Sequence, residues 1–197
     1  MTTGLVSRTD ALLLIVDIQE KLVPAIHPDL GARAIKNATV LIEAAAILGV
    51  PIVVTEQYPK GLGRTVPEIL RALADRPYQL VEKVAFSCAR DEAFRAAVSA
   101  LGRRQVIVAG MEAHVCVYQT AVDLVRAGTA VCVLDDAIAS RSLHNYQSAL
   151  QALRQAGCLV QSTEAAIFQL LERAATPEFK QVAPLIKWPW RRSPCAG

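Results

Sequence analysis

Cys116 is the strongest candidate for a nucleophile in this sequence. It follows the apolar run Gln105–Ala109 and Gly110, and a helical pattern begins at Val115, so the thiol is expected in the first turn of a helix that follows a strand. Unpaired backbone N–H groups and the helix dipole favour an anion there, and such positions lower a thiol pKa from its usual value of about 8.5. The alternative is an inert buried thiol, because free cysteine is among the most buried residue types.

Two charged residues could assist this thiol. Asp17 comes directly after the apolar run Leu12–Val16, so its carboxylate is expected at the end of a buried strand, where an ionised group is costly unless it is paired. Lys83 follows Gln79–Glu82, and beside Asp17 its ammonium group would balance the carboxylate and favour a thiolate. The alternatives are a helix cap for Asp17 and a solvated surface position for Lys83.

Four residues are candidates for contacts with a substrate. His114 lies two residues before Cys116 and could form a thiol–imidazole dyad, but residues two apart on a helix do not face each other. We therefore expect His114 at the wall of a pocket or on the surface. Gln19, Tyr58 and Phe86 are pocket-wall candidates because of their positions in loops.

Short apolar runs alternate with helical patterns along the chain. Each run is rich in Val, Ile or Leu and is bounded by turn or charged residues, as buried strands are. The strands are expected at Leu12–Val16, Pro51–Thr55, Gln105–Ala109, Ala130–Leu134 and Cys158–Gln161. The helices are expected at Leu30–Leu48, Asp91–Leu101, Val115–Ala127 and Leu143–Ala156, each followed at once by glycine.

This alternation predicts an α/β fold. Crossover connections join parallel strands in a sheet that is covered on both faces, so the expected architecture is a three-layer α/β/α sandwich. Ligands bind beyond the carboxyl ends of such strands. The segments expected there are Asp17, Glu56–Arg64, Gly110–Cys116 and Asp135–Arg141. The stretch Glu56–Gly63 is expected to be a loop over the pocket, with a plain surface loop as the alternative.

The composition predicts one compact domain spanning residues 1–197. Apolar residues make up 53% of the chain and charged residues 20%, which is enough apolar material to bury a sheet on both faces. The 21 basic residues are scattered among 18 acidic ones, which argues against nucleic-acid binding. No leader pattern and no apolar stretch of the roughly 18 to 20 residues that span a membrane is seen, so we expect no membrane partner.

The five cysteines form an odd set without a CxxC motif or framework spacing. Reduced thiols in the cytoplasm are the simplest interpretation. A basic segment with two tryptophans lies near the C-terminus, from Lys187 to Arg192. We expect a packed or frayed tail from about residue 187, with a membrane or subunit contact as the alternative.

Several common catalytic motifs are absent. The sequence contains no GxGxxG, GxxxxGK[ST] or GxSxG motif, so dinucleotide binding, phosphate-loop hydrolysis and the usual serine-hydrolase arrangement have no support. His27, His114 and His144 are far apart and show no zinc-ligand spacing. We expect neither a metal nor a cofactor.

Three segments resemble the signatures of isochorismatase-like cysteine hydrolases, in the same order along the chain. They are LLLIVDIQEKL around Asp17, VEKVAFSC around Lys83 and VIVAGMEAHVCVYQTAVDLVRAG around Cys116. The resemblance covers nearly the whole chain. Two further segments, Thr55–Ile69 and Asp136–Ser142, are similar to the isochorismatase domain-containing branch, near the YcaC-related hydrolases.

The resemblance implies a six-stranded parallel sheet with a Rossmann-like topology and a catalytic triad carried by Asp17, Lys83 and Cys116. It implies that Asp17 takes the thiol proton, that Lys83 stabilises the charged pair and that the sulfur attacks a carbonyl carbon. It assigns the oxyanion hole to the backbone N–H groups of Glu112 and Cys116, with a cis bond between Met111 and Glu112. It also implies a homo-oligomer.

One departure from the wider superfamily bears on the chemistry. Where metal-dependent nicotinamidases carry histidine ligands, this chain reads Glu56, Gln57 and Tyr58, so a metal-dependent nicotinamidase is not expected. True isochorismatases cleave a vinyl ether without a cysteine nucleophile, so Cys116 favours hydrolysis of a small amide-like C–N bond through a thioester. The alternatives are a catalytically silent binding or scaffold protein and a redox sensor that pairs Cys116 with a resolving thiol such as Cys88.

Overall fold

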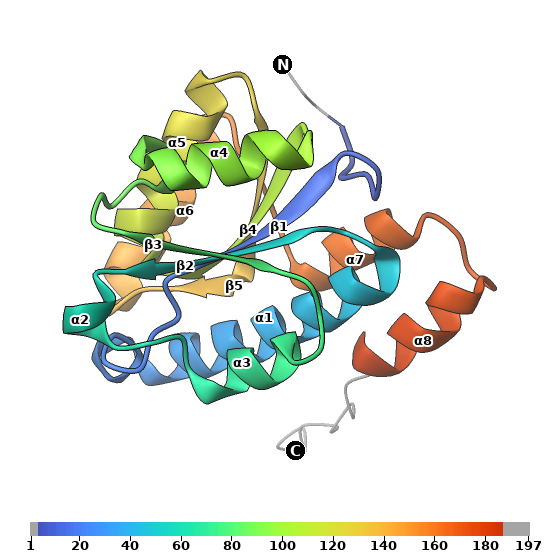
Figure 1. The fold of residues 1–197 in the computed structure, drawn as a ribbon, viewed down its shortest axis with the longest axis horizontal. Helices are drawn as coiled ribbons and strands as arrows, with labels where there is room; N and C mark the ends of the chain where they lie inside the picture. Colours follow the sequence, from blue (N-terminus) through green and yellow to red (C-terminus); the bar gives the residue numbers. More distant parts are fainter. Residues whose placement is uncertain (1–3, 187–197) are drawn as a thin grey trace, which may run out of the picture.

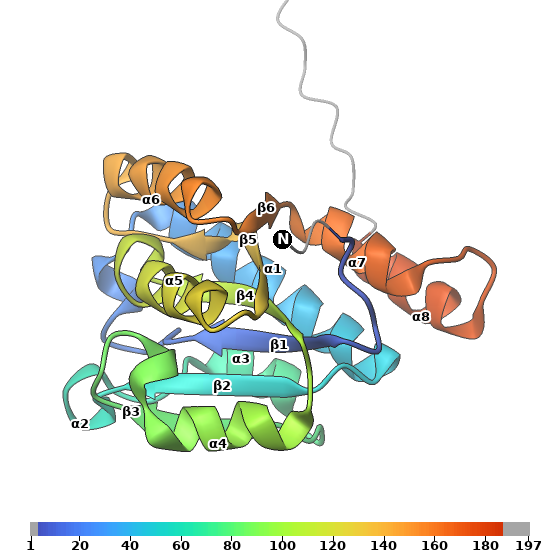
Figure 2. The same ribbon diagram turned by 90° about the horizontal axis from the view of Figure 1, so that it is seen from above.

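The computed structural model describes residues 4–186. Within this range, six parallel strands form one sheet in the order β3-β2-β1-β4-β5-β6. The strands are β1 (Ala11–Val16), β2 (Ile52–Gln57), β3 (Gln79–Lys83), β4 (Gln105–Met111), β5 (Ala130–Ala139) and β6 (Leu159–Gln161). Figure 2 shows β5, β4, β1 and β2 lying side by side in this order. The predicted parallel sheet is confirmed.

Helices cover both faces of this sheet. The helices are α1 (Pro28–Leu48), α2 (Pro59–Leu62), α3 (Pro67–Leu73), α4 (Glu92–Leu101), α5 (Tyr118–Arg126), α6 (Leu143–Gln155), α7 (Thr163–Leu171) and α8 (Pro177–Ile186). In Figure 1, α1 and α3 lie below the sheet and α4, α5 and α6 above it, while α7 and α8 pack against α1. This is the predicted three-layer α/β/α sandwich. None of the described helices is long and apolar enough to cross a membrane.

Strand β1 occupies the middle of the sheet because its whole sequence, Ala-Leu-Leu-Leu-Ile-Val, is apolar and all six residues are buried. A strand covered on both faces requires such a continuous apolar run. The chain builds β2 and β3 on one side of β1 and then crosses to β4 on the other side. The carboxyl ends of β1 and β4 therefore flank the crevice where ligands bind in open α/β sheets. Asp17 follows β1 at this crevice, and Cys116 lies beyond β4.

The structure differs from the sequence prediction in several segments. Strand β3 and helices α3, α7 and α8 were not among the predicted elements. Glu56 and Gln57 belong to β2, and the following residues form the helical turn α2, so Glu56–Gly63 is not a simple loop. Strand β5 continues to Ala139, into the predicted loop Asp135–Arg141. The tail expected from about residue 187 lies outside the described residues.

Gly110 is a glycine that the close approach of two strands requires. Its φ is +130°, and an added Cβ atom would lie 2.0 Å from the carbonyl oxygen of Val16 on the neighbouring strand. The register between β4 and β5 also shifts between Val108 and Gly110. This packing brings the end of β4 against the end of β1, which Asp17 follows directly.

We expect Gly110→Ala to lower the free energy of unfolding by more than about 4 kcal/mol, because the backbone of Val16 cannot move away from the new methyl group. Gly102→Ala is the matched control, since Gly102 has φ +61° but no heavy atom within 4 Å of an added Cβ. It should cost only about 1–2 kcal/mol. Urea unfolding of both variants measures the difference, and equal losses would contradict this account of Gly110.

Candidate active site

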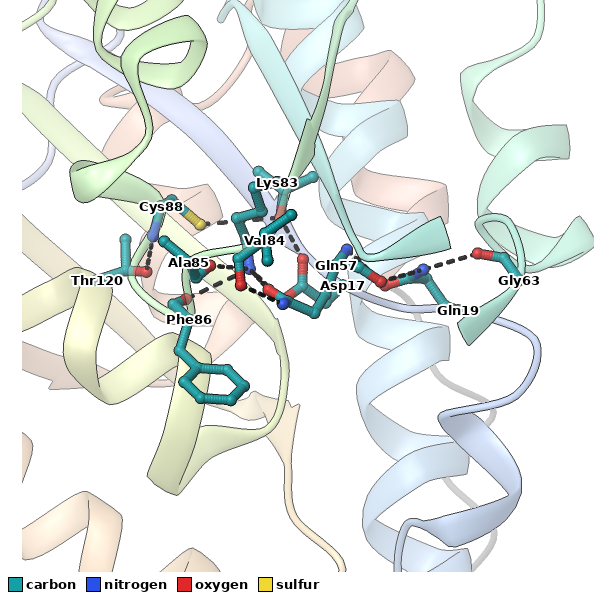
Figure 3. Close-up of polar contacts among 11 residues, drawn as sticks. Asp17, Gln19, Gln57, Gly63, Lys83, Val84, Ala85, Phe86, Cys88 and Thr120 are labelled. Carbon is teal, nitrogen blue, oxygen red and sulfur yellow. Dashed lines mark hydrogen bonds and ion pairs between the residues drawn. The ribbon is translucent and has the colours of Figure 1, made fainter. Parts of the chain in front are cut away.

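A buried ion pair joins the first two candidate residues. Lys83 Nζ lies 2.7 Å from Asp17 Oδ2, and both side chains are 0% exposed. Strand β3 lies two strands from β1, about 10 Å at the usual strand spacing, so the long lysine side chain is needed to reach Asp17. Thr55, at the end of β2 between them, donates a hydrogen bond of 2.6 Å to Asp17 Oδ1. Figure 3 shows Lys83 reaching Asp17.

Lys83 Nζ is surrounded by oxygen atoms. Besides Asp17 Oδ2, it lies 2.6 Å from Gln57 Oε1 and 3.3 Å from the carbonyl oxygens of Ala85 and Phe86. Burial acts to lower the pKa of Lys83, but the charge and hydrogen bond of Asp17 and the influence of Cys88 and Cys116 together outweigh it, so the pKa is raised. Lys83 is therefore a fixed cation, and its surface alternative is wrong.

Cys116 lies in the π-helical turn Ala113–Val117 that links β4 to α5, and it is 6% exposed. Burial raises the pKa of its thiol, as do the charge of Asp17 and a hydrogen bond with that carboxylate, while Lys83 acts to lower it. The net shift is upward, so the thiol is uncharged at neutral pH. The expectation that a helix start lowers this pKa is wrong, because burial and the charge of Asp17 outweigh that contribution.

The structure thus brings Asp17, Lys83 and Cys116 into one cluster at the crevice. Asp17 does not cap a helix that starts at Gln19, since the next helical turn begins at Val23. Among residues 4–186, no three His, Cys, Asp or Glu side chains are grouped as ligands of a metal ion would be.

An ion pair holds the segment that leads to Cys116. The Met111–Glu112 peptide bond is cis, as the resemblance implies. The side chain of Glu112 is 6% exposed, and its carboxylate accepts hydrogen bonds from Arg141 Nη2 at 2.6 Å and from Arg141 Nε at 2.9 Å. Burial opposes the charge of Glu112, but the hydrogen bonds and charge of Arg141 outweigh it, so the pKa of Glu112 is lowered. This pair ties the end of β4 to the end of β5.

The predicted pocket-wall residues have different roles. Gln19 is 0% exposed, and its side-chain amide bonds only to backbone groups of Gln57 and Gly63, so its assignment to the wall is wrong. Tyr58 and Phe86 are 53% and 55% exposed, and the ring of Phe86 points away from Lys83 in Figure 3. His114 bonds to Ser140 Oγ at 3.0 Å and to Asn145 Nδ2 at 3.3 Å, a contact set without Cys116.

The segment after β2 is fixed by a buried carboxylate. Glu56 Oε1 accepts hydrogen bonds from the N–H and the hydroxyl of Thr65 at 2.7 and 2.8 Å, and its Oε2 lies 2.9 Å from Arg64 Nη1. Burial opposes the charge of Glu56, but the bonds from Thr65 and Arg64 outweigh it, and the pKa is lowered. Residues 58–64, including Tyr58, are therefore held over the carboxyl ends of the strands.

A second thiol lies beside the ion pair. Cys88 is 0% exposed, and its Sγ lies 3.8 Å from Thr55 Oγ1. Burial, together with the charge of Asp17, raises the pKa of Cys88 to about 11. All four described cysteines are unpaired thiols. Cys88 is thus inaccessible and uncharged in this state.

Sequence reasoning missed Thr55 and Gln57, which contact the cluster, and Arg141, which pairs with Glu112. The signal for the first two was the run of polar residues Thr-Glu-Gln that ends an apolar strand. Arg141 gave no comparable signal, because its partnership with Glu112 depends on the parallel pairing of the ends of β4 and β5.

Comparisons with known proteins agree with this fold. The family model described as the isochorismatase domain matches residues 11–165. Isochorismatase domain-containing protein 2 of Danio rerio is 38% identical over 94% of this chain and 91% of the relative. A structure described as the MAR1 ribonuclease from Caenorhabditis elegans is 35% identical, covers 98% of both chains and has a TM-score of 0.87.

A third similar structure is that of the Escherichia coli YcaC gene product, described as an octameric hydrolase of unknown specificity. It is 26% identical, with a TM-score of 0.78, over 88% of this chain and 85% of the other. The parallel sheet and its flanking helices are thus shared with proteins of this family.

The state of the Cys116 thiol can be measured by alkylation. We expect the rate at which iodoacetamide modifies Cys116 to rise about tenfold per pH unit between about pH 7 and 9, because only the thiolate reacts and the pKa is raised. Peptide mass spectrometry separates Cys116 from the other cysteines. Asp17→Asn should speed modification at about pH 7, since it removes the negative charge that raises this pKa. A plateau near neutral pH would contradict the raised pKa.

The ion pair between Glu112 and Arg141 should stabilise the fold only where Glu112 is ionised. Its folded pKa lies below the usual 4.5, so its contribution is fully present above about pH 4.5 and is lost as the pH falls through the folded pKa. The difference in the free energy of unfolding between the wild type and Glu112→Gln should therefore shrink in acid. Glu68→Gln is the control, because Glu68 is half-exposed. A constant difference down to about pH 3 would count against the pair.

Proposed function

Because the chain belongs to the isochorismatase family, we propose that it is a cysteine hydrolase that cleaves a small amide-like C–N bond through a thioester on Cys116. The observation that supports this most is the buried ion pair between Asp17 and Lys83, which lies close enough to Cys116 for both charges to act on the pKa of its thiol. A thiol, a base and a fixed cation in one cluster are the groups that nucleophilic catalysis requires.

In the first half of the reaction, Asp17 takes the proton of the Cys116 thiol as the sulfur attacks the carbonyl carbon. A C–S bond forms, and the carbonyl electron pair moves to the oxygen. We assign the stabilisation of that oxyanion to the backbone N–H groups of Glu112 and Cys116. The C–N bond then breaks, and the leaving amine takes the proton from Asp17, which leaves a thioester.

In the second half, water attacks the thioester carbon, and Asp17 accepts a proton from this water. The C–S bond breaks, the acid is released, and the proton returns to the Cys116 sulfur. Lys83 keeps its charge throughout, because its raised pKa opposes deprotonation. It therefore acts by stabilising whichever of Asp17 and Cys116 carries the negative charge.

The charges around the site favour an uncharged substrate. Lys83 is paired with Asp17, and Arg141 is paired with Glu112, so both cations are already neutralised. The exposed side chain of Phe86 follows Lys83 in the chain, and Tyr58 adjoins Gln57. A small amide with an apolar substituent is therefore a better match than a substrate with a carboxylate.

RNA hydrolysis is a second candidate, because the similar protein from C. elegans is described as a ribonuclease. Cleavage of a phosphodiester places negative charge on oxygen atoms and benefits from cations that can contact them. The side chain of Lys83 is 0% exposed, and its ammonium group already bonds to Asp17 and Gln57. We therefore place amide hydrolysis first and include RNA in the substrate panel.

Three expectations from the sequence stay predictions. A homo-oligomer is supported by the octameric description of the E. coli relative, and the second expectation is a location in the cytoplasm. The single domain spanning 1–197 is likewise a prediction.

A silent scaffold would bind partners without turnover, and a redox sensor would form a disulfide between Cys116 and Cys88 in response to an oxidant such as a peroxide.

Cys116→Ala is expected to lower kcat on any accepted amide by more than about 1000-fold, because the attacking atom is lost. The measurement is a panel of small amides and a labelled single-stranded RNA, with acid-quenched samples examined for an acyl mass on the Cys116 peptide. Cys158→Ala is the matched control, since Cys158 is another buried thiol at a distance from the ion pair.

Turnover that survives in Cys116→Ala would overturn the proposal. Cleavage of RNA alone, without an acyl adduct, would favour the second candidate. Absence of hydrolysis across the panel, together with unchanged partner binding by Cys116→Ala, would favour the scaffold.

A further inference from the structure

We propose that Gln57 is a positioning residue that holds the Lys83 ammonium group against Asp17, and that Gln19 in turn fixes Gln57. The inference rests on the proposed function, since it assigns a role within the same reaction centre. The observation behind it is a pair of buried glutamines: the Gln19 side chain bonds to the backbone of Gln57, and the Gln57 side chain bonds to Lys83. Figure 3 shows these contacts running from Gly63 through Gln19 and Gln57 to Lys83.

The orientation of the Gln57 amide is determined by its partners. Its Oε1 lies 2.6 Å from Lys83 Nζ, and its Nε2 donates to the carbonyl oxygen of Val84 at 2.6 Å. A flipped amide would face an ammonium group with its own N–H groups and a carbonyl with its own oxygen. Gln57 therefore offers the cation an oxygen acceptor without adding a charge.

The position of Gln57 is fixed by Gln19. The Oε1 of Gln19 accepts a hydrogen bond of 2.8 Å from the backbone N–H of Gln57, and its Nε2 donates to the carbonyl oxygens of Gln57 at 3.1 Å and Gly63 at 2.7 Å. All three bonds go to backbone groups, and the side chain is buried. Gln19 thus clamps the end of β2 to the segment that precedes Thr65.

A backbone hydrogen bond also connects the end of β2 to Lys83. The N–H of Tyr58 donates to the carbonyl oxygen of Lys83 at 2.8 Å, so the residue after Gln57 is also tied to the lysine. The carbonyl oxygens of Ala85 and Phe86 lie farther from Nζ, at 3.3 Å, than do the two side-chain oxygens. Asp17 and Gln57 therefore make the closest contacts and set the direction of the ammonium group.

A neutral acceptor at position 57 has an electrostatic consequence. Asp17 and Lys83 together carry no net charge. When Cys116 gives its proton to Asp17, the negative charge moves to the sulfur, and Lys83 still faces one negative charge. A carboxylate at position 57 would compete with Asp17 for that cation and would place a second negative charge near the thiol. It would raise the pKa of Cys116 further and oppose thiolate formation.

Alkylation of Cys116 tests this without any knowledge of the substrate. At a fixed pH, iodoacetamide should modify Cys116 more slowly in Gln57→Glu than in the wild type. The rate should fall about tenfold for each unit by which the substitution raises the pKa of Cys116. Gln79→Glu is the matched control, because it adds the same charge on β3, four residues before Lys83. It should leave the rate at the wild-type value. Equal rates in Gln57→Glu and Gln79→Glu would overturn the inference.

Gln57→Leu tests positioning in the reaction itself. It removes the acceptor at nearly constant volume, so kcat on an accepted amide should fall about 10- to 100-fold while KM stays within about threefold. A purely structural role would lower the thermal midpoint and leave kcat of the folded protein unchanged, and that result would also overturn the inference. If Gln57→Leu does not fold, the alkylation rate of Gln57→Glu decides.

The two proposals fail in different ways. If Cys116→Ala retains turnover, the hydrolase mechanism is wrong, whatever the variants of Gln57 do. If Cys116→Ala is inactive and forms no acyl adduct but both Gln57 variants match the wild type, the mechanism stands and the positioning role of Gln57 is wrong.

Discussion

The ion pair between Asp17 and Lys83 is the interaction on which the rest of the site depends. Two charges removed from water are costly unless their geometry is good and their remaining hydrogen-bonding groups are satisfied. Here Thr55 occupies Asp17 Oδ1, and Gln57 and two carbonyl oxygens surround Lys83 Nζ. Losing one partner of such a pair typically costs about 3–5 kcal/mol, because the other charge is left unpaired. The pair therefore constrains how the ends of three strands must lie.

The order of the sheet follows from this constraint. Lys83 must approach Asp17 across β2, so the residues that end β2 have to be polar where they face the pair. Thr55 and Gln57 meet this requirement, and Glu56, which alternates with them along the strand, holds Thr65 and Arg64 instead. At the end of β2, the side chains of Thr55 and Gln57 thus contact the ion pair, and the side chain of Glu56 contacts the overlying segment. On the other side of β1, Gly110 lets β4 approach closely enough to bring Cys116 to the same point.

The sequence predicted the parts of the fold that depend on local pattern. Continuous apolar runs identified five of the strands, and glycine at helix ends identified four helices, since these signals are local. Strand β3 has only two apolar residues, Leu80 and Val81, because it is an edge strand and is half-exposed. Residue types suggested Cys116 and Asp17, but the partnership of Lys83 with Asp17 depends on strand order, which no local pattern encodes. The same reason explains why Gln19 was assigned to the pocket wall.

The raised pKa of Cys116 fits a nucleophile that is activated only during the reaction. Burial is the main cause of this raised pKa and the charge of Asp17 adds to it, while Asp17 is also the group that can accept the proton. When the proton moves, the negative charge passes from the carboxylate to the sulfur, and Lys83 remains the cation beside both. The net charge of the buried cluster does not change, so the transfer does not require a new charge to be buried. A resting thiolate beside an ionised Asp17 would instead place two negative charges against one cation.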